Sequence, residues 1–134
     1  MHFKYLLDTN ICIYIAKQQP KTVMKRFEKL EMGEVGMSMI TYGELLYGAK
    51  KSRFPEQARE KLVELTTLIP SLSLNDDVAD HYGDIRAHLE KAGKPIGNND
   101  LWIAAHARSL KVILVTNNLR EFNRVPKLNM ENWI

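Results

Sequence analysis

The sequence predicts an α/β domain with three layers, in which helices cover both faces of a mainly parallel sheet. Short apolar runs that suit buried strands alternate along the chain with longer segments whose apolar residues recur at helical spacing. Turn-forming residues separate these segments. Such alternation favours a parallel sheet, because the chain must cross one face of the sheet between two parallel strands. The 134 residues suffice for one domain, which we expect to span residues 1–134.

Four short apolar segments are predicted to form the strands of this sheet. They cover residues 3–7, 35–40, 72–74 and 112–115. The first leads directly into Asp8-Thr9-Asn10 and the last into Thr116-Asn117-Asn118. Because active sites of parallel sheets lie beyond the carboxyl ends of the strands, these two polar segments are candidate positions for a site.

Six segments between and beside the strands are predicted to be amphipathic helices. They cover residues 9–16, a stretch from Pro20 to Leu30, residues 41–49, a stretch from Pro55 to Ile69, residues 78–92, and residues 100–109. Asn98 or Asn99 is expected to cap the last of these helices, since both can accept a hydrogen bond from a free backbone N–H.

Composition narrows the class of function. The only cysteine, Cys12, cannot form a disulfide within the chain, and no Cys/His cluster has the spacing of a structural zinc site. Nineteen Lys and Arg against sixteen Asp and Glu give a net charge of +3, which is compatible with binding of nucleic acid. No segment resembles a signal peptide or reaches the ~20 apolar residues that span a bilayer, so we expect a cytoplasmic protein that does not bind membranes.

Three acidic residues stand at junctions between predicted elements. Asp8 follows the first strand, Glu44 lies in the first turn after the second, and Asp100 opens a helix. Each has a structural interpretation: Asp8 can cap the next helix, Thr41 and Glu44 match a capping box, and an anion suits the helix N-terminus at Asp100. Together they indicate more, because a doubly wound sheet would gather them, and repelling carboxylates that converge usually bind a hard cation.

Four sequence blocks resemble, in order, those of PIN-domain ribonuclease toxins of the VapC family, from VapBC type II toxin–antitoxin systems. The blocks are LLDTNI at 6–11, ITYGELLYGA at 40–49, PIGNNDLWIAAHA at 95–107, and LVTNN at 114–118 with REF at 120–122. The similarity spans nearly the whole chain and ends in Glu131-Asn132-Trp133.

This resemblance implies a PIN-like fold and an endoribonuclease that depends on Mg²⁺ or Mn²⁺, inhibits translation, and is neutralised by a VapB-type antitoxin. Relatives with similar blocks act on the anticodon loop of initiator tRNA, so this structured RNA is our first candidate substrate. We also expect a homodimer.

The resemblance also assigns residues to the site. Asp8, Glu44 and Asp100 are expected to bind the metal and to be catalytic. PIN domains often carry a fourth acid after the fourth strand, where this chain has Thr116 and Asn117. We expect these two residues to act as neutral helpers that hold water at the metal, and Glu121 to be a distant ligand, so that a second metal site is in doubt.

The mechanism stays open in one respect: Asp8 and Asp100 hold the metal directly, whereas Glu44 either binds it through water or orients the attacking water. Six basic residues are candidate RNA contacts or, equally, a solvated rim: Lys50, Lys51, Arg53, Arg86, Lys94 and Arg120. His106 and Trp102 are expected to serve packing or hydrogen bonding rather than catalysis.

Two other functions remain as alternatives. An aspartate after the first strand also suits a phosphoacceptor or phosphatase domain, although a receiver-type site would need a second acid beside Asp8 and a lysine in place of Thr116-Asn117-Asn118. The other alternative is a noncatalytic nucleic-acid-binding module, in which the acids only cap helices.

Overall fold

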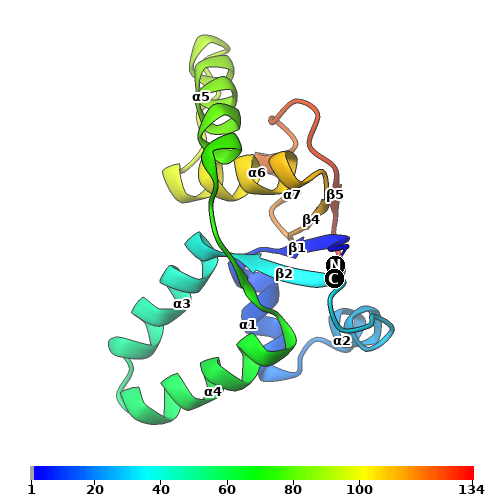
Figure 1. Ribbon diagram of the computed structural model, residues 1–134, viewed down its shortest axis with the longest axis vertical. Helices are drawn as coiled ribbons and strands as arrows, with labels where there is room; N and C mark the ends of the chain where they lie inside the picture. The colour runs from blue at the N-terminus through cyan, green and yellow to red at the C-terminus, as the bar shows by residue number, and fades with distance from the viewer. Residues whose placement is uncertain (1) are drawn as a thin grey trace.

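The computed structural model describes residues 2–134, and at its centre lies a five-stranded sheet in which all strands run parallel (Figure 1). The strands are β1 (Tyr5–Leu7), β2 (Val35–Ser38), β3 (Ser71–Leu72), β4 (Ile113–Val115) and β5 (Met130–Glu131). Their order across the sheet is β3-β2-β1-β4-β5. The predicted three-layer α/β architecture with a parallel sheet is therefore confirmed.

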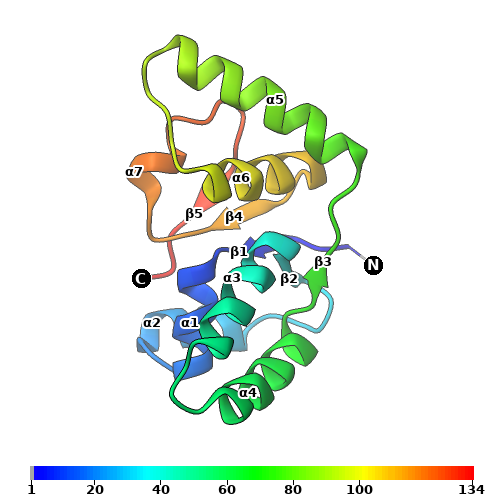
Figure 2. The ribbon, with the colours of Figure 1, turned by 90° about the vertical axis from the view of Figure 1, so that its left-hand side faces the viewer.

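Helices cover both faces of this sheet (Figure 2). On one side lie α1 (Thr9–Lys17), α2 (Lys21–Glu28), α3 (Met39–Lys50) and α4 (Pro55–Leu68), and on the other α5 (Asp76–Lys91), α6 (Asn98–Leu110) and α7 (Leu119–Phe122). The division follows from handedness, because right-handed crossovers that move in opposite directions along a sheet place their helices on opposite faces.

Alternating side chains of the central strands supply the two halves of the core. Leu6 and Leu114 pack among apolar side chains of α5 and α6, whereas their neighbours Leu7 and Val115 pack with α1, α4 and Trp133. All four strand residues are fully buried. The period of two along a strand thus produces the apolar runs that the sequence shows, since both faces must be apolar.

The strand order reverses between β1 and β4, and this reversal fixes the place of a site. From β1 the chain proceeds outward through β2 to β3, then returns to β4 on the other side of β1 and proceeds to β5. The helices after β1 and after β4 therefore diverge to opposite faces and leave a crevice at the carboxyl ends of these strands. Asp8 and Thr116 are the residues that follow β1 and β4.

Two predicted boundaries around β2 and β3 are wrong. The second strand ends at Ser38 rather than at residue 40, because the Ser38 hydroxyl accepts a hydrogen bond from the Ile40 N–H at 3.1 Å and caps α3. Thr41 therefore lies inside the helix, and the capping box with Glu44 does not form. The third strand is Ser71–Leu72, which pairs with Met37 and Ser38, rather than residues 72–74.

The predicted cap of α6 is also wrong. The helix begins at Asn98 and Gly97 occupies the N-cap, so neither Asn98 nor Asn99 caps it through a side chain. The Asn98 side chain instead accepts a hydrogen bond from the Tyr82 hydroxyl. Helix α7 and strand β5 were not among the predicted elements, because four-residue and two-residue segments carry too little periodicity to be recognised. Within residues 2–134, every helix is too short or too polar to cross a membrane.

Candidate functional site

Asp8 directly follows β1 at the carboxyl end of the sheet, where it is 6% exposed and uses both carboxylate oxygens. Oδ1 accepts a hydrogen bond from the Ile11 N–H at 3.0 Å and so caps α1. Oδ2 accepts one from the Thr116 hydroxyl at 2.5 Å, which joins the ends of β1 and β4. The capping interpretation is confirmed. Capping does not exclude the predicted metal-binding role, since a carboxylate oxygen that accepts one hydrogen bond keeps a lone pair for another partner.

Glu44 approaches Asp8 from the second turn of α3. Its Oε1 accepts a hydrogen bond from the Thr9 hydroxyl at 2.7 Å, and this hydroxyl also lies 3.3 Å from that of Thr41. Thr9 is the residue directly after Asp8, so the first turn of α1 holds both acids. Glu44 is half-buried and, as predicted, its carboxylate is directed away from the apolar core.

Asp100 lies in the first turn of α6, where three other carboxylates surround it. Its pKa is raised from the ordinary 3.8 to about 6, first by desolvation on burial and then by the negative charges of Glu121, Glu44 and Asp8. A side-chain hydrogen bond with Glu121 favours the protonated form further. Each neighbour comes from a different part of the chain, and together they make a concentration of negative charge that favours either a proton or a cation at Asp100.

Glu121 is closer to this group than its position in the sequence suggested. Its charge is the largest electrostatic influence on the pKa of Asp100. The Asn118 amide donates a hydrogen bond to Glu121 Oε2 and directs this carboxylate from α7 toward α6. Glu121 thus adds a fourth carboxylate near Asp8, Glu44 and Asp100.

The pKa of Asp8 is also raised. Burial is the main cause, with a smaller contribution from the charge of Glu44, while the hydrogen bonds from Thr116 and Ile11 act in the opposite direction.

The donor set has the chemistry of a site for a hard divalent cation. The nearby thiol of Cys12 is buried in the core, where its Sγ faces the carbonyl oxygen of Leu7 at 3.8 Å. Carboxylate oxygens without thiolate or imidazole suit Mg²⁺ or Mn²⁺ better than zinc.

The carboxylates converge without enclosing an ion. Among residues 2–134, no three His, Cys, Asp or Glu side chains lie close enough together to hold a metal ion. A divalent cation bound here would therefore need oxygens of water or substrate as further ligands, which Mg²⁺ readily takes.

The two predicted neutral helpers have different surroundings. Thr116 is fully buried, and its hydroxyl donates to Asp8 and accepts from the Asn118 N–H at 2.9 Å, so it orients a carboxylate. Asn117 is exposed and donates to the Tyr14 hydroxyl at 3.1 Å. Sequence reasoning missed Thr9 and Asn118, although both stand in the polar segments after β1 and β4 that drew attention to the site.

His106 connects the two helices that carry Glu44 and Asp100. It is buried, and its Nδ1 lies 2.8 Å from the hydroxyl of Ser38, the residue that caps α3. Burial lowers the pKa of His106. The predicted hydrogen-bonding role of His106 is thus observed. Packing, as predicted, is also observed for Trp102, whose ring stacks on Tyr82 with centroids 3.9 Å apart.

The six basic candidates fall into two groups in different layers of the fold. One group lies at the turn from α3 to α4, where Lys51 and Arg53 contact the rings of Tyr47 and Phe54. The other lies on α5, α7 and the loop before α6; its member Arg86 is engaged with Glu90 and with the Tyr82 hydroxyl. All are exposed: Lys50, Lys51, Arg53, Arg86, Lys94 and Arg120.

Comparison with known proteins agrees with this geometry. The family model described as "PIN domain" matches residues 5–128. The chain is 47% identical over 131 residues to Ribonuclease VapC2 of Haemophilus influenzae, covering 98% of each chain. It is 45% identical over 130 residues to the tRNA(fMet)-specific endonuclease VapC of Shigella flexneri, covering 97% of this chain and 98% of that one.

Solved structures show the same similarity in three dimensions. A chain of VapBC-1 from nontypeable Haemophilus influenzae superimposes with a TM-score of 0.91 at 43% identity, with 98% of each chain covered. A chain of the DNA-bound VapBC from Salmonella typhimurium gives a TM-score of 0.92 at 40% identity, covering 98% and 99%.

Proposed function

This chain belongs to the PIN-domain family and, within it, to the VapC ribonucleases of toxin–antitoxin systems, and we propose that it is an endoribonuclease that cleaves structured RNA with Mg²⁺, or with Mn²⁺ in its place. The observation that supports metal dependence is that the charges of three carboxylates, Asp8, Glu44 and Glu121, act on that of Asp100. Such a cluster is electrostatically unfavourable unless a cation or a proton joins it.

Asp8 and Asp100 would hold the ion, with Glu44 and Glu121 on either side of them. Phosphodiester hydrolysis needs a cation that stabilises charge on the phosphate oxygens and raises the acidity of water, and a bound Mg²⁺ supplies both. Two or three carboxylates with water suit this ion, and Glu121 compensates for the acid that is missing after β4.

The surrounding residues preorganise these acids. Thr116 and the Ile11 N–H fix the two oxygens of Asp8, and Thr9 fixes the Glu44 carboxylate. Asn118 fixes Glu121. Oriented groups need no rearrangement when charge develops on the substrate, which is the main source of electrostatic catalysis. Glu44, hydrogen-bonded to Thr9 Oγ1 and half-buried, is in position either to orient the attacking water or to bind the ion through water.

The proposed substrate is the anticodon loop of initiator tRNA. This proposal rests on relatives whose names specify tRNA(fMet), at 45% and 41% identity over nearly the whole chain. Cleavage there would inhibit initiation of translation, as expected of a toxin.

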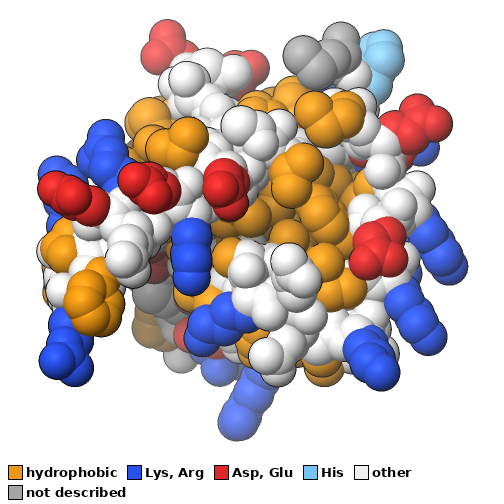
Figure 3. Space-filling view, turned by 90° about the horizontal axis from the view of Figure 1, so that it is seen from below, with side chains coloured by type: hydrophobic (Ala, Val, Ile, Leu, Met, Phe, Trp, Pro, Cys, Tyr) orange, Lys and Arg blue, Asp and Glu red, His pale blue; other side chains and the backbone are white. Residues whose placement is uncertain are grey.

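A VapB-type antitoxin is the proposed partner, and an apolar groove beside the site suits it. The groove has a volume of about 720 Å³, and Ile13, Leu45, Leu62 and Leu65 line it between α1, α3 and α4. Glu44 stands at its margin. Seen from the side of α1, α2 and α4, apolar side chains form a continuous exposed area with Lys and Arg at its edges (Figure 3). An amphipathic antitoxin segment in this groove would reach the acids and could place an arginine among them.

Incubation of the purified protein with total RNA and with initiator tRNA tests the activity. Cleavage that appears with millimolar Mg²⁺, is absent with chelator, and maps to the anticodon loop supports the proposal. Labelling of Asp8 by a small phosphodonor, without cleavage, would instead support the phosphoacceptor function.

Co-expression with the neighbouring antitoxin gene tests the partner. We expect a copurifying complex that lacks ribonuclease activity, and light scattering should show the toxin as a dimer. Recovery of active, uncomplexed protein would contradict the partner proposal.

A further inference from the structure

A second cavity, separate from the apolar groove, lies between the end of α5, the loop that follows it, and α7. Its volume is about 350 Å³. Four basic side chains line it: His88 from α5, Lys94 from the loop, and Arg120 and Arg124 from α7 and the residues after it. We call this cavity the basic pocket.

The basic pocket carries uncompensated positive charge. No acidic residue lines it among the described residues 2–134. The ion pairs formed within this range are Lys4–Glu34, Arg26–Glu131, Arg86–Glu90 and Arg108–Asp84, and none uses a pocket residue. Asp84 is near enough to His88 for the two charges to interact, but its carboxylate binds Arg108.

One of the four side chains also maintains the shape of the pocket. The Arg124 guanidinium donates a hydrogen bond to the Pro95 carbonyl oxygen at 3.1 Å, which holds the loop after α5 against the residues after α7. The fold thus fixes the position of Arg124, while the side chains of Lys94 and Arg120 are exposed.

The basic pocket adjoins the carboxylate site through α7. Arg120 lines the pocket, and its neighbour Glu121 contacts Asp100. Successive side chains of a helix diverge by about 100°, so one short helix presents a cation to the pocket and an anion to the metal site. The pocket and the carboxylate site therefore take side chains from consecutive residues of the same helix.

We infer that the basic pocket binds a backbone phosphate of the RNA, next along the chain from the phosphate that is cleaved. The inference rests on the proposed ribonuclease function and adds a subsite to it. Guanidinium and ammonium groups bind phosphate through charge-assisted hydrogen bonds, and arginine does so bidentately. The lining offers no Phe, Tyr or Trp ring on which a base could stack, which favours the backbone as the group that is recognised.

The test compares Arg120→Gln, Lys94→Gln and the double variant with Lys25→Gln, which removes an exposed cation from α2 in the opposite layer. Arg124 is left intact because of its bond to Pro95. Affinity for fluorescent initiator tRNA is measured by anisotropy in chelator, where cleavage is absent, over a series of KCl concentrations. Thermal melts establish that each variant is folded.

We expect the double variant to bind at least about tenfold more weakly than wild type, and the slope of log Kd against log salt to fall by roughly 0.7 to 0.9 for each phosphate that the variant no longer neutralises. In cleavage assays the effect should fall on KM rather than on kcat, while Lys25→Gln behaves as wild type. Affinity and slope in the double variant equal to those of Lys25→Gln would overturn the inference. A double variant that binds RNA with wild-type affinity but no longer binds the antitoxin would also overturn the inference, because the pocket would then recognise a protein.

The same experiment separates this inference from the proposed function. If wild-type protein cleaves RNA with Mg²⁺ while Arg120→Gln, Lys94→Gln and the double variant all bind RNA as wild type does, the phosphate subsite alone is refuted. Wild-type protein that does not cleave RNA would refute the ribonuclease proposal and with it the subsite.

Discussion

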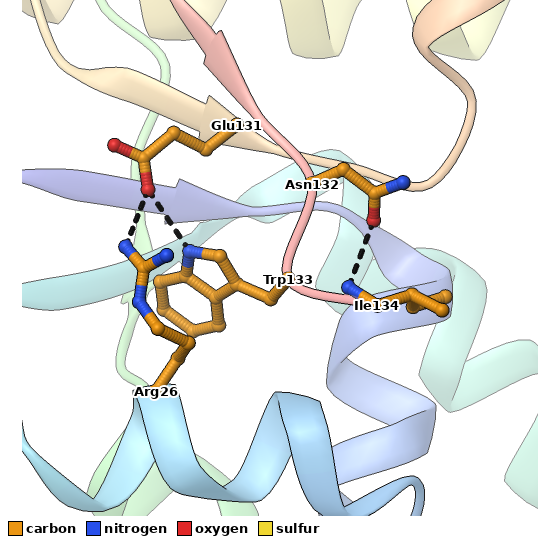
Figure 4. A network of polar contacts seen from close by, with 5 residues as sticks. All are labelled: Arg26, Glu131, Asn132, Trp133 and Ile134. Carbon is orange, nitrogen blue, oxygen red and sulfur yellow. Dashed lines mark hydrogen bonds and ion pairs between the residues drawn. The ribbon is translucent and has the colours of Figure 1, made fainter.

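Carboxylates have opposite surroundings in two regions of this molecule. Near the C-terminus, Glu131 accepts a hydrogen bond at 2.6 Å from Arg26 of α2 and one at 3.1 Å from the Trp133 indole N–H, while Asn132 binds the Ile134 N–H (Figure 4). In the crevice, Asp8 and Asp100 have acidic neighbours instead of a basic partner. Glu131 near the C-terminus thus has a basic partner, whereas Asp8 and Asp100 lie near other acids.

A second paired acid shows the same contrast through its titration. Arg108 contacts Asp84 at 2.6 Å and lowers its pKa, through a hydrogen bond first and through charge second. The pKa of Asp100 moves in the opposite direction, to about 6. Glu131 and Asp84 thus each have a basic side chain of the same chain as partner, whereas Asp8 and Asp100 have acidic neighbours and could be paired by a cation from solution.

The sharpest test of this contrast is activity. Asp8→Asn and Asp100→Asn should each reduce RNA cleavage by at least ~100-fold, because a preorganised group that stabilises charge is removed, and Glu44→Gln should have a comparable effect. Glu131→Gln is the matched control from the paired region. Cleavage rates at saturating Mg²⁺ decide: unchanged rates in all three variants would mean that these acids only cap helices.

Removal of Arg108, the basic partner of Asp84, should affect stability rather than activity. Arg108 is nearly buried and donates to the ring of His81, the Pro126 carbonyl oxygen and Asp84. Arg108→Ala should lower the free energy of unfolding by about 2 kcal/mol, because it leaves the partly buried acceptors of His81 and Pro126 without a donor. Urea denaturation measures this, with Asp84→Asn as the control that keeps the other two bonds. A decrease equally large in Asp84→Asn would mean that the exposed ion pair, not the buried bonds, stabilises this junction.

The metal site itself should be destabilising in the absence of metal. The folded pKa of Asp100, about 6, lies above its ordinary 3.8, so between these values the folded state binds more protons than the unfolded state. Stability therefore decreases as pH rises from about 4 to 6, and at neutral pH the full penalty applies. After allowance for partial exposure the penalty is about 1 to 2 kcal/mol. Asp100→Asn removes it but sacrifices a favourable anion at a helix N-terminus, worth about 0.3 to 1 kcal/mol.

Asp100→Asn should therefore melt above wild type in chelator at pH 7, and the difference should vanish near pH 4. Mg²⁺ should stabilise wild type more than the variant, because a ligand of the folded state adds stability according to its affinity. Thermal melts with chelator and with millimolar Mg²⁺ measure both effects. A variant less stable than wild type in chelator would show that Asp100 is chiefly structural, and equal Mg²⁺ shifts would remove it from the metal site.

The acids of the crevice could be found from sequence because strand ends are local features. Asp8 follows an apolar run, and parallel topology alone places it beside the residue after β4. Glu44 and Asp100 were likewise predicted from their positions at junctions between elements, and the resemblance then implied their role at a metal. The contact of Glu121 with Asp100 could not be foreseen in the same way, since it depends on α7, a four-residue helix without a periodic pattern, and on Asn118.

The two ion pairs, Arg26–Glu131 and Arg108–Asp84, could not be predicted from the sequence, for a different reason. Arg26 and Glu131 are 105 residues apart, and Arg108 and Asp84 are 24 apart. A single sequence shows no pattern that links two surface charges at such separations, because their contact follows from the packing of whole elements. Likewise the sequence predicts that the strand continues past Ser38, and the hydrogen bond that its hydroxyl accepts from the Ile40 N–H marks Ser38 as the last residue of β2 and the cap of α3.

The smallest effect is expected for the Arg26–Glu131 pair itself. Both side chains are partly exposed, at 44% and 33%, so water and salt screen their attraction, and such pairs contribute at most about 1 kcal/mol. Arg26 also lies over the Trp133 ring, 5.3 Å from its centroid, and this contact persists in high salt. Arg26→Gln should therefore cost less than about 1 kcal/mol in urea denaturation, with only part of the effect suppressed at about 1 M salt. Glu131→Gln keeps the cation–π interaction and an acceptor for the Trp133 N–H, so its smaller effect should disappear in high salt. A destabilisation of several kcal/mol in either variant would show that this exposed pair stabilises the fold as a buried pair does, and the contrast between the two regions would then rest on burial rather than on pairing.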